Sequence, residues 1–229
     1  MSRAPSRLQT FIGSLEAFYG RVAKPAATDP LEMILWENIA YLADDARRAQ
    51  AWETFRKRIG TTPKEILAAP RAELMTIARA GILAADRVEK ILEIAAIALH
   101  EFGGDLNKAL DDAPKGAKKA LKKFPSIGDP GAEKILLFSR RQPVLALESN
   151  GLRVLLRLGY GKEEKNYSAS YRSAQEATRA EWKRDFDWLI AAHQLLRRHG
   201  QELCKRTRPR CEACPLRGEC AYYRSLMRT

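Results

Sequence analysis

Apolar residues recur at helical spacing along almost the whole chain, and alternation of the strand type is nearly absent. Glycine and proline, which interrupt helices, are sparse. This pattern predicts an all-α protein built from many short helices. The expected helices cover residues 6–21, 29–43, 45–59, 63–69, 71–80, 84–102, 105–111, 115–122, 130–140, 148–158, 167–180, 182–199 and 215–225.

Local signals mark where several of these helices begin. Thr62 and Asp129 each precede a proline, which is tolerated at the first helical position because its missing N–H has no helical partner there. Asp44 and Ser168 are further candidate N-caps, since their side-chain oxygens can accept from free N–H groups of the first turn.

Two polar stretches divide the chain, KPAATDP at 24–30 and SRRQP at 139–143. We therefore expect residues 29–140 to form a central helical domain. The flanking pieces, 1–28 and 141–229, are then expected to pack together as a second domain.

The chain is strongly basic, with 40 lysine and arginine residues against 28 aspartate and glutamate residues and a net charge of +12. Such an excess attracts polyanions, above all nucleic acid, although an arginine-rich surface with no specific partner is the alternative. Charged residues interrupt every apolar stretch before it reaches membrane-spanning length, and the first residues lack the apolar core of a secretory signal. We therefore expect a cytoplasmic protein with no membrane contact, associated with the nucleoid if bacterial or archaeal.

A compact turn lies between two expected helices at 122–138, KKFPSIGDPGAEKILLF. A helix ends in lysines, the turn contains Pro125 and Gly128, and a new helix begins at Pro130. Ile127 is placed to anchor the turn in the core, while Gly128 permits a close backbone approach. Such a turn can direct N–H groups at a phosphate, helped by the positive end of the following helix. An ordinary connection between helices is the alternative.

All four cysteines lie near the C-terminal end, with the spacing C-x6-C-x2-C-x5-C. A disulfide framework normally ties distant parts of a small secreted domain together, so this tight cluster indicates a metal site instead. Four thiolates suit a tetrahedral zinc ion or a cubane iron–sulfur cluster, and residue chemistry alone leaves both open. The candidate ligands are Cys204, Cys211, Cys214 and Cys220.

These segments together resemble the helix-hairpin-helix (HhH-GPD) superfamily of DNA glycosylases, specifically its endonuclease III branch. The family hairpin Leu-Pro-Gly-Val-Gly is similar to Phe-Pro-Ser-Ile-Gly at 124–128. The family's apolar, acidic, hydroxyl and His segment before Arg-Val is similar to Leu-Glu-Ser-Asn at 147–150, before Arg-Val at 153–154. A glycine turn within 78–91, the His-Gly-Gln of 199–201 and the cysteine spacing also fit, so the resemblance covers nearly the whole chain.

The resemblance implies an all-α, two-domain endonuclease III-like fold with a helix-hairpin-helix motif at about 115–138. It also implies that the four cysteines hold a [4Fe–4S] cluster in a C-terminal loop that meets the DNA backbone. The implied partner is double-stranded DNA with a damaged, mismatched or distorted site, bound by a monomer. The residues expected to contact DNA are Lys122, Lys123, Ser126, Gly128, Gly131, Arg153, Lys205, Arg206, Arg208 and Arg210.

The catalytic positions depart from the family pattern. Bifunctional endonuclease III-like enzymes use a lysine after the hairpin, which attacks the sugar and forms a Schiff base, and an aspartate that assists. Pro130 and Glu148 stand at these positions, and a proline offers no amine for such an attack. Glu148 could stabilise an oxocarbenium-like sugar or activate water, or it could simply cap the helix that starts near Ser149. Lys134 is the alternative amine, one helical turn beyond Pro130.

The second expected helix resembles the family helix that ends beside the lesion pocket. Asn38 stands where the endonuclease III branch has a glutamine that helps to fill the space left by a flipped base. Glu37 and Asn38 offer polar groups for reading a base edge, and Tyr41 could stack or wedge. Trp36, Tyr41 and Leu42 at this spacing also form an ordinary core stripe, so the sequence does not identify the substrate.

Three functions can be weighed against these features. The first, which we favour, is a base-excision repair glycosylase that hydrolyses the N-glycosidic bond of a damaged or mismatched base without a Schiff base. The second is a non-catalytic binder of damaged or distorted DNA on the same scaffold. The third, a zinc-stabilised RNA-binding protein, disagrees with the pattern along the whole chain.

Overall fold

The computed structural model describes residues 4–228. Every regular element in this range is a helix, so the predicted all-α class is confirmed. None of these described helices has the length and apolar character needed to cross a membrane. The chain divides into two compact units. Pro25–Arg141 forms the inserted unit, and Met1–Lys24 with Gln142–Thr229 forms the terminal unit.

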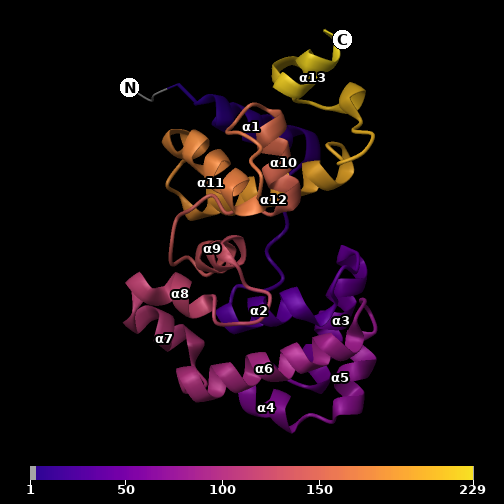
Figure 1. The fold of residues 1–229 in the computed structure, drawn as a ribbon, viewed down its shortest axis with the longest axis vertical. Coiled ribbons are helices and arrows are strands. Elements are labelled where there is room, and N and C mark those ends of the chain that lie inside the picture. The colour runs from indigo at the N-terminus through magenta and orange to yellow at the C-terminus, as the bar shows by residue number, and fades with distance from the viewer. Residues whose placement is uncertain (1–3, 229) are drawn as a thin grey trace. The chain divides into compact units, whose positions relative to one another are not determined.

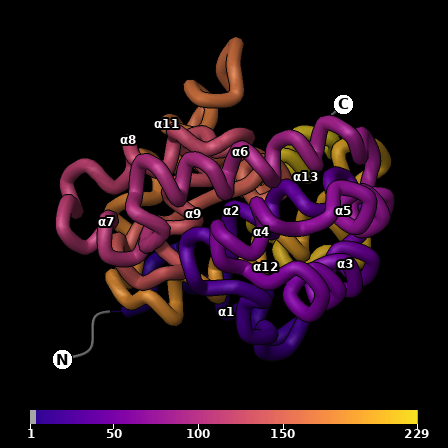
Figure 2. The backbone as a smooth tube through the Cα atoms, turned by 90° about the horizontal axis from the view of Figure 1, so that it is seen from below, coloured from indigo at the N-terminus to yellow at the C-terminus, as the bar shows by residue number. Residues whose placement is uncertain are grey.

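The inserted unit consists of short helices grouped around one long helix. They are α2 (Pro30–Ile39), α3 (Asp45–Arg58), α4 (Pro63–Ala68), α5 (Arg71–Ala78), α6 (Ala84–Phe102), α7 (Leu106–Asp112), the short turn η1 (Pro114–Gly116), α8 (Ala117–Leu121) and α9 (Asp129–Phe138). The long helix α6 packs against α2, α4 and α5, which lie beside it in both views (Figure 1, Figure 2). The core between them is apolar and includes the fully buried side chains of Ile34, Ile66, Leu74 and Ile91.

Side-chain caps fix the starts of several of these helices. Thr62 and Glu65 form a reciprocal capping box at the start of α4. Asp44 caps α3 by accepting from the backbone N–H of Arg47 at 2.9 Å. The sequence predicts both starts, and the structure confirms them. Replacing such a cap by alanine typically costs about 1 kcal/mol of stability.

The turn between α5 and α6 packs closely against the end of α2. The N–H of Ile82 donates to the carbonyl of Tyr41 at 3.0 Å. A Cβ atom on Gly81 would stand 2.5 Å from the backbone nitrogen of Tyr41, so only glycine fits this approach. The contact holds the first turn of α6, which contains Arg87, beside the end of α2.

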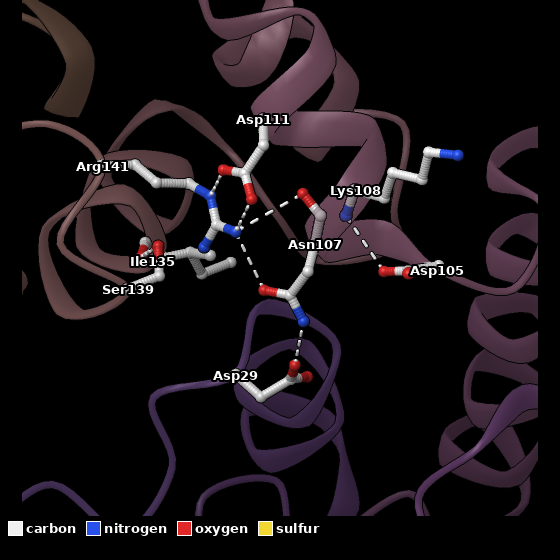
Figure 3. Close-up of polar contacts among 8 residues, drawn as sticks. All are labelled: Asp29, Asp105, Asn107, Lys108, Asp111, Ile135, Ser139 and Arg141. Atoms are coloured by element: carbon white, nitrogen blue, oxygen red, sulfur yellow. Dashed lines mark hydrogen bonds and ion pairs between the residues drawn. The ribbon is translucent and has the colours of Figure 1, made fainter.

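A polar clamp joins residues near the two ends of the inserted unit (Figure 3). Arg141, which follows α9, binds the Asp111 carboxylate through Nε at 2.8 Å and through Nη2 at 3.0 Å. Nη2 also donates to Oδ1 of Asn107 at 2.9 Å. Asn107 in turn donates through Nδ2 to Asp29, the N-cap of α2. Because paired guanidinium–carboxylate bonds are strong and directional, the clamp fixes the start of α2 and the end of α9 to α7.

The terminal unit combines helices from both ends of the chain. They are α1 (Arg7–Tyr19), α10 (Ser149–Arg157), α11 (Tyr167–Thr178), the short turn η2 (Arg179–Glu181), α12 (Phe186–Glu202), the turns η3 (Cys211–Ala213) and η4 (Arg217–Glu219), and α13 (Ala221–Leu226). Within this unit α12 packs against α1 and α10 (Figure 1). A Cβ atom on Gly200 would stand 2.6 Å from the carbonyl oxygen of Asn150, so glycine permits the close crossing of α10 and α12.

Several predicted helix bounds are wrong, and three of them change where a helix begins or ends by four residues or more. Helix α2 ends at Ile39 rather than at residue 43, because the chain turns back through Leu42, whose φ is 58°. Residues 182–185 are not part of α12, which begins only after its N-cap Asp185. Residues 215–220 form a loop with the turn η4, and α13 starts after the last cysteine.

Two predicted caps also differ. The N-cap of α11 is Asn166 rather than Ser168, and its side chain accepts from the backbone of Ala169 at 2.9 Å. The N-cap of α9 is Gly128, and Asp129 is the first helical residue. Its carboxylate binds lysines of α8 and the following turn, so it is not used as a cap.

Candidate nucleic-acid interface and cysteine loop

The hairpin between α8 and α9 is a tight turn with an unusual residue at its third position. The N–H of Ile127 donates to the carbonyl of Phe124 at 3.2 Å, which closes the turn. Ser126 has a φ of 66°, in the left-handed region that favours glycine, where other residues lose about 1–2 kcal/mol. Phe124 and Ile127 are buried, so the apolar anchor predicted at Ile127 is confirmed.

The outer side of the hairpin presents backbone N–H groups. Ser126 and Gly128 are exposed, and neither N–H has a hydrogen-bond partner within the described residues. Gly131 lies in the first turn of α9, which receives no side-chain cap from Gly128. The N-terminal end of a helix carries a partial positive charge. Free amides beside such an end can bind a phosphate oxygen.

The lysines beside the hairpin form ion pairs within the inserted unit. Lys122 contacts the Asp129 carboxylate at 2.9 Å, and Lys118 contacts it at 3.6 Å. The bond from Lys122, with further help from Lys118, holds the pKa of the Asp129 carboxyl below its ordinary value. Lys123 pairs with Glu101 of α6. A phosphate contact by Lys122 or Lys123 would therefore have to replace an existing carboxylate partner.

The two positions in α9 considered from the sequence hold a proline and an ion-paired lysine. Pro130 occupies the first turn of the helix. Lys134, one turn further, forms an ion pair with Glu37 of α2. An attack on a sugar by this amine would require the ion pair to break first.

The other residues predicted for a substrate pocket lie at and after the end of α2. Asn38 is fully buried, and its Nδ2 donates to the carbonyls of Ile34 at 2.9 Å and Pro125 at 3.4 Å. Tyr41 is half-buried, and the guanidinium carbon of Arg87 lies 3.8 Å from the centre of its ring. Asn38 thus joins α2 to the hairpin instead of presenting its amide to solvent, whereas Tyr41 keeps part of its ring at the surface.

Arg87 is the member of this group that the sequence analysis missed. Its side chain is only 5% exposed, and Nη1 donates to Asn38 Oδ1 and Ser126 Oγ, each at 3.3 Å. Nη2 lies 3.4 Å from the Asp86 carboxylate. The sequence does contain a signal for this residue, because Arg87 interrupts the apolar stripe of α6 that continues with Ile91.

In the terminal unit, Glu148 caps α10. Its Oε1 accepts from the N–H of Gly151 at 2.6 Å, and Oε2 accepts from Nδ2 of Asn150 at 2.8 Å. The capping role considered from the sequence is therefore confirmed. Arg153 donates to Asn150 Oδ1 at 2.7 Å and to the Cys204 carbonyl at 2.8 Å. Residues predicted for catalysis and for DNA binding thus form one network that reaches the first cysteine.

The cysteine loop is held by Arg157. Its Nη1 lies 3.4 Å from the Cys204 sulfur and donates to the Lys205 carbonyl at 2.7 Å, while Nη2 donates to the Arg206 carbonyl at 3.1 Å. The Cys220 thiol donates to the carbonyl of Arg157 at 3.4 Å. One arginine therefore contacts the first and the last of the four cysteines.

Cys214 lies against a buried histidine. Its sulfur is 3.5 Å from Nε2 of His199, whose Nδ1 is 3.1 Å from the Tyr19 hydroxyl. Burial lowers the pKa of His199 to about 4, so the ring is neutral at neutral pH. Burial also raises the pKa of the Cys214 thiol to about 11, with further contributions from the other three cysteines. Metal binding would displace this thiol proton.

Two features of the four thiols bear on whether they could hold a metal centre. Among residues 4–228, no three cysteine, histidine or acidic side chains converge on a point that would hold one metal ion. A cubane cluster makes a different demand, because each thiolate binds a separate iron and the ligands surround a larger body. All four thiols are partly buried, and the guanidinium beside Cys204 is a donor of the kind that stabilises cluster sulfur.

The segment between the first two cysteines is basic and exposed. Its four charged side chains are those of Lys205, Arg206, Arg208 and Arg210. None of them forms an ion pair with an acidic residue in the described chain. Because these charges are not neutralised locally, they are available to a polyanion.

Curated relatives carry DNA-repair names. The chain is 24% identical over 201 residues to Endonuclease III of Thermotoga maritima, an alignment that covers 86% of this chain and 85% of that protein. It is 32% identical over 108 residues to Endonuclease III of Rickettsia conorii, covering 47% and 48%. It is 24% identical over 174 residues to Thymine-DNA glycosylase of Aeropyrum pernix, covering 76% and 74%. No protein-family model matches the chain.

Solved structures share the fold. A non-covalent Endonuclease III–DNA complex matches with a TM-score of 0.77 at 19% identity, covering 97% of this chain and 98% of that chain. A thermostable thymine-DNA glycosylase matches with a TM-score of 0.74 at 18% identity, covering 95% and 97%.

The resemblance to the helix-hairpin-helix DNA glycosylase superfamily is supported by these relatives and structures. The endonuclease III-like fold predicted from the sequence is confirmed. Pro130 lies in the first turn of α9 and Glu148 is the N-cap of α10, at the positions where the resemblance implies a lysine and an aspartate.

Proposed function

We propose that this protein is a monofunctional DNA glycosylase of base-excision repair, which hydrolyses the N-glycosidic bond of a damaged or mismatched base. The hairpin carries the proposal, because the exposed N–H groups of Ser126 and Gly128 have no partner in the described chain. Such amides position a DNA backbone without reading its sequence. The similarity to endonuclease III and to a thymine-DNA glycosylase supports glycosidic-bond chemistry on this scaffold.

The proposed DNA contacts form two sets, one in each unit. In the inserted unit they are the hairpin amides and neighbouring lysines, from Lys122, Lys123, Ser126, Gly128 and Gly131. In the terminal unit they are the exposed charges of the cysteine loop, from Lys205, Arg206, Arg208 and Arg210. We do not include Arg153 among these contacts and instead propose that it holds the loop, because its donors already bind the Cys204 and Gly200 carbonyls.

The proposed reaction proceeds without a Schiff base. Pro130 has no amine, and Lys134 is paired with Glu37. Borohydride treatment in the presence of abasic-site DNA should therefore yield no covalent adduct. A robust adduct that disappears in Lys134→Met would show that this lysine is the nucleophile and would overturn the monofunctional assignment.

Glu148 is the carboxylate proposed to stabilise the positively charged sugar or to activate water. Glu148→Gln keeps an oxygen for the α10 cap but removes the charge. We expect this variant to melt near the wild-type temperature and to lose roughly 10²–10⁴-fold in the rate of base release. Glu148→Ala is the matched control, because it removes the cap as well and should also lower stability.

A non-catalytic binder of damaged or distorted DNA is the second candidate. One observation favours it, since both oxygens of Glu148 are already engaged at the start of α10. A panel of duplexes with damaged or mismatched bases separates the two, with base release and strand nicking scored separately. Tight binding across the panel with no base release, unchanged in Glu148→Gln, would favour the binder.

We also propose that Cys204, Cys211, Cys214 and Cys220 hold a [4Fe–4S] cluster. When bound, the cluster would supply four strong bonds that order the basic loop. Protein purified without oxygen should be brown, with broad visible absorption and iron and sulfide in equal amounts. Colourless protein with one zinc ion per chain would contradict the assignment.

A further inference from the structure

Arg87 is a buried cation that points at the hairpin from inside the inserted unit. Its side chain is 5% exposed, and the guanidinium stacks on Tyr41 with 3.8 Å between its carbon and the ring centre. A buried guanidinium is stable only where its donors find oxygen acceptors. Nη1 finds two at 3.3 Å, Asn38 Oδ1 and Ser126 Oγ, and Nη2 lies 3.4 Å from the Asp86 carboxylate, whereas Nε has no partner among the described residues.

The backbone conformation of Ser126 is strained, so a contact that fixes its side chain is useful here. Its φ of 66° is a conformation that glycine adopts freely and that serine rarely adopts. The bond from Arg87 to the Ser126 hydroxyl fixes the side chain of the strained residue. A second link reaches the preceding residue, since Asn38, itself bound to Arg87, donates to the Pro125 carbonyl at 3.4 Å. Two consecutive hairpin residues are thus tied to α2 and α6.

We propose that Arg87 is a positioning residue, which locks Ser126 in its left-handed conformation and so presets the hairpin N–H groups for a phosphate. The second half of this inference rests on the proposed function, whereas the first half concerns the free protein alone. Because Arg87 is almost completely buried, it makes no phosphate contact itself.

The test uses variants of the full-length protein. Arg87→Met removes the donor, and Ser126→Ala removes the acceptor while leaving the Arg87–Asn38 bond in place. Ser126→Gly removes the need for the lock, because glycine takes positive φ without strain. Arg48→Met is the matched control, since Arg48 is a partly buried arginine of α3 whose Nε has no hydrogen-bond partner among the described residues.

The first readout is amide hydrogen exchange of residues 124–131 without DNA. We expect faster exchange in Arg87→Met and Ser126→Ala, wild-type exchange in Arg48→Met, and restoration when Ser126→Gly is added to Arg87→Met. Restoration by glycine separates positioning from general stability, because a glycine at 126 cannot replace the other contacts of Arg87. Unchanged exchange in both single variants, or no restoration, would overturn the inference.

The second readout is affinity for a DNA duplex as a function of salt. Arg87→Met should weaken binding roughly tenfold, as for the loss of one hydrogen bond, with an unchanged salt slope because no charged contact is lost. A slope reduced by about one would instead place Arg87 on a phosphate and overturn the positioning role. If exchange behaves as expected but the wild type binds no DNA, the proposed function fails and the lock on Ser126 stands.

Discussion

Three arginines, Arg87, Arg153 and Arg157, direct their guanidinium groups at oxygen atoms inside the units. A guanidinium has five donors in one plane, so a single side chain can hold several carbonyl or hydroxyl oxygens that no helix pairs. Each of the three supports a turn or loop that carries exposed donors. An arginine or lysine of this protein is therefore a candidate for DNA contact only where its side chain is exposed.

Asp129 gives a prediction at this scale. Its pKa is lowered in the folded protein, so its stabilising contribution is present above the unfolded pKa, near 3.8, and is lost as pH falls through the lower folded value. Asp129→Asn should therefore be less stable than the wild type at pH 6, by less than about 1 kcal/mol because the pair is partly exposed to solvent. Chemical denaturation from pH 6 to pH 2 should show this difference shrinking. Lys122→Met, which removes the main partner of Asp129, should show the same shrinking difference.

At the scale of elements, predictions succeeded where local chemistry decides the structure. Helix α6 has the predicted bounds because its apolar stripe ends at Gly103, whose φ is 62°. Residues 182–185 were expected to be helical because their composition allows it, yet the cap at Asp185 starts α12 later. The hairpin was predicted from Pro125 and Gly128, but Arg87 was not, because its contacts join residues far apart in the sequence.

The clamp of Arg141 predicts a stability effect confined to the inserted unit. Arg141→Met removes the bonds to Asp111 and Asn107. We expect a loss of about 2 kcal/mol in urea unfolding, since hydrogen bonds to charged groups contribute about 1.5–3 kcal/mol. The exposed pair of Arg56 with Glu53 serves as the control, and Arg56→Met should cost less than about 0.5 kcal/mol. Equal losses in both variants would contradict the clamp.

The contacts of Arg157 predict how firmly the cysteine loop would hold the proposed cluster. Arg157→Met removes the donors to the Cys204 sulfur and to two loop carbonyls. We expect iron to be released to a chelator at least tenfold faster, in line with the effect of other residues that support metal ligands. Arg179→Met, an exposed change in the same unit, should release iron at the wild-type rate. The assay follows visible absorption after addition of the chelator, and equal rates would contradict the support role.

At the scale of the whole molecule, the net charge of +12 is distributed unevenly between paired and unpaired residues. Hairpin lysines have carboxylate partners, as Lys122 has Asp129, whereas the charged side chains of the cysteine loop have none in the described chain. Electrostatic attraction to DNA should therefore depend more on the loop than on the total charge.

The salt dependence of DNA binding tests this distribution. Removing Arg206 and Arg208 together should lower the slope of log K against log salt by about 1.8, or 0.9 for each phosphate contact. The control removes Arg56 and Lys64, which gives the same net charge, +12 minus 2, without touching the loop. Equal slopes in the two double alanine variants would show that only total charge matters.

The clamp at the ends of the inserted unit also bears on how such a chain could arise. Asn107 binds both Asp29, near the start of the unit, and Arg141, its last residue. A segment whose own side chains hold its two ends together is suited to insertion into another protein, because domain insertion is tolerated where the ends lie close together. The hairpin and Arg87 both lie within that segment, whereas all four cysteines lie outside it.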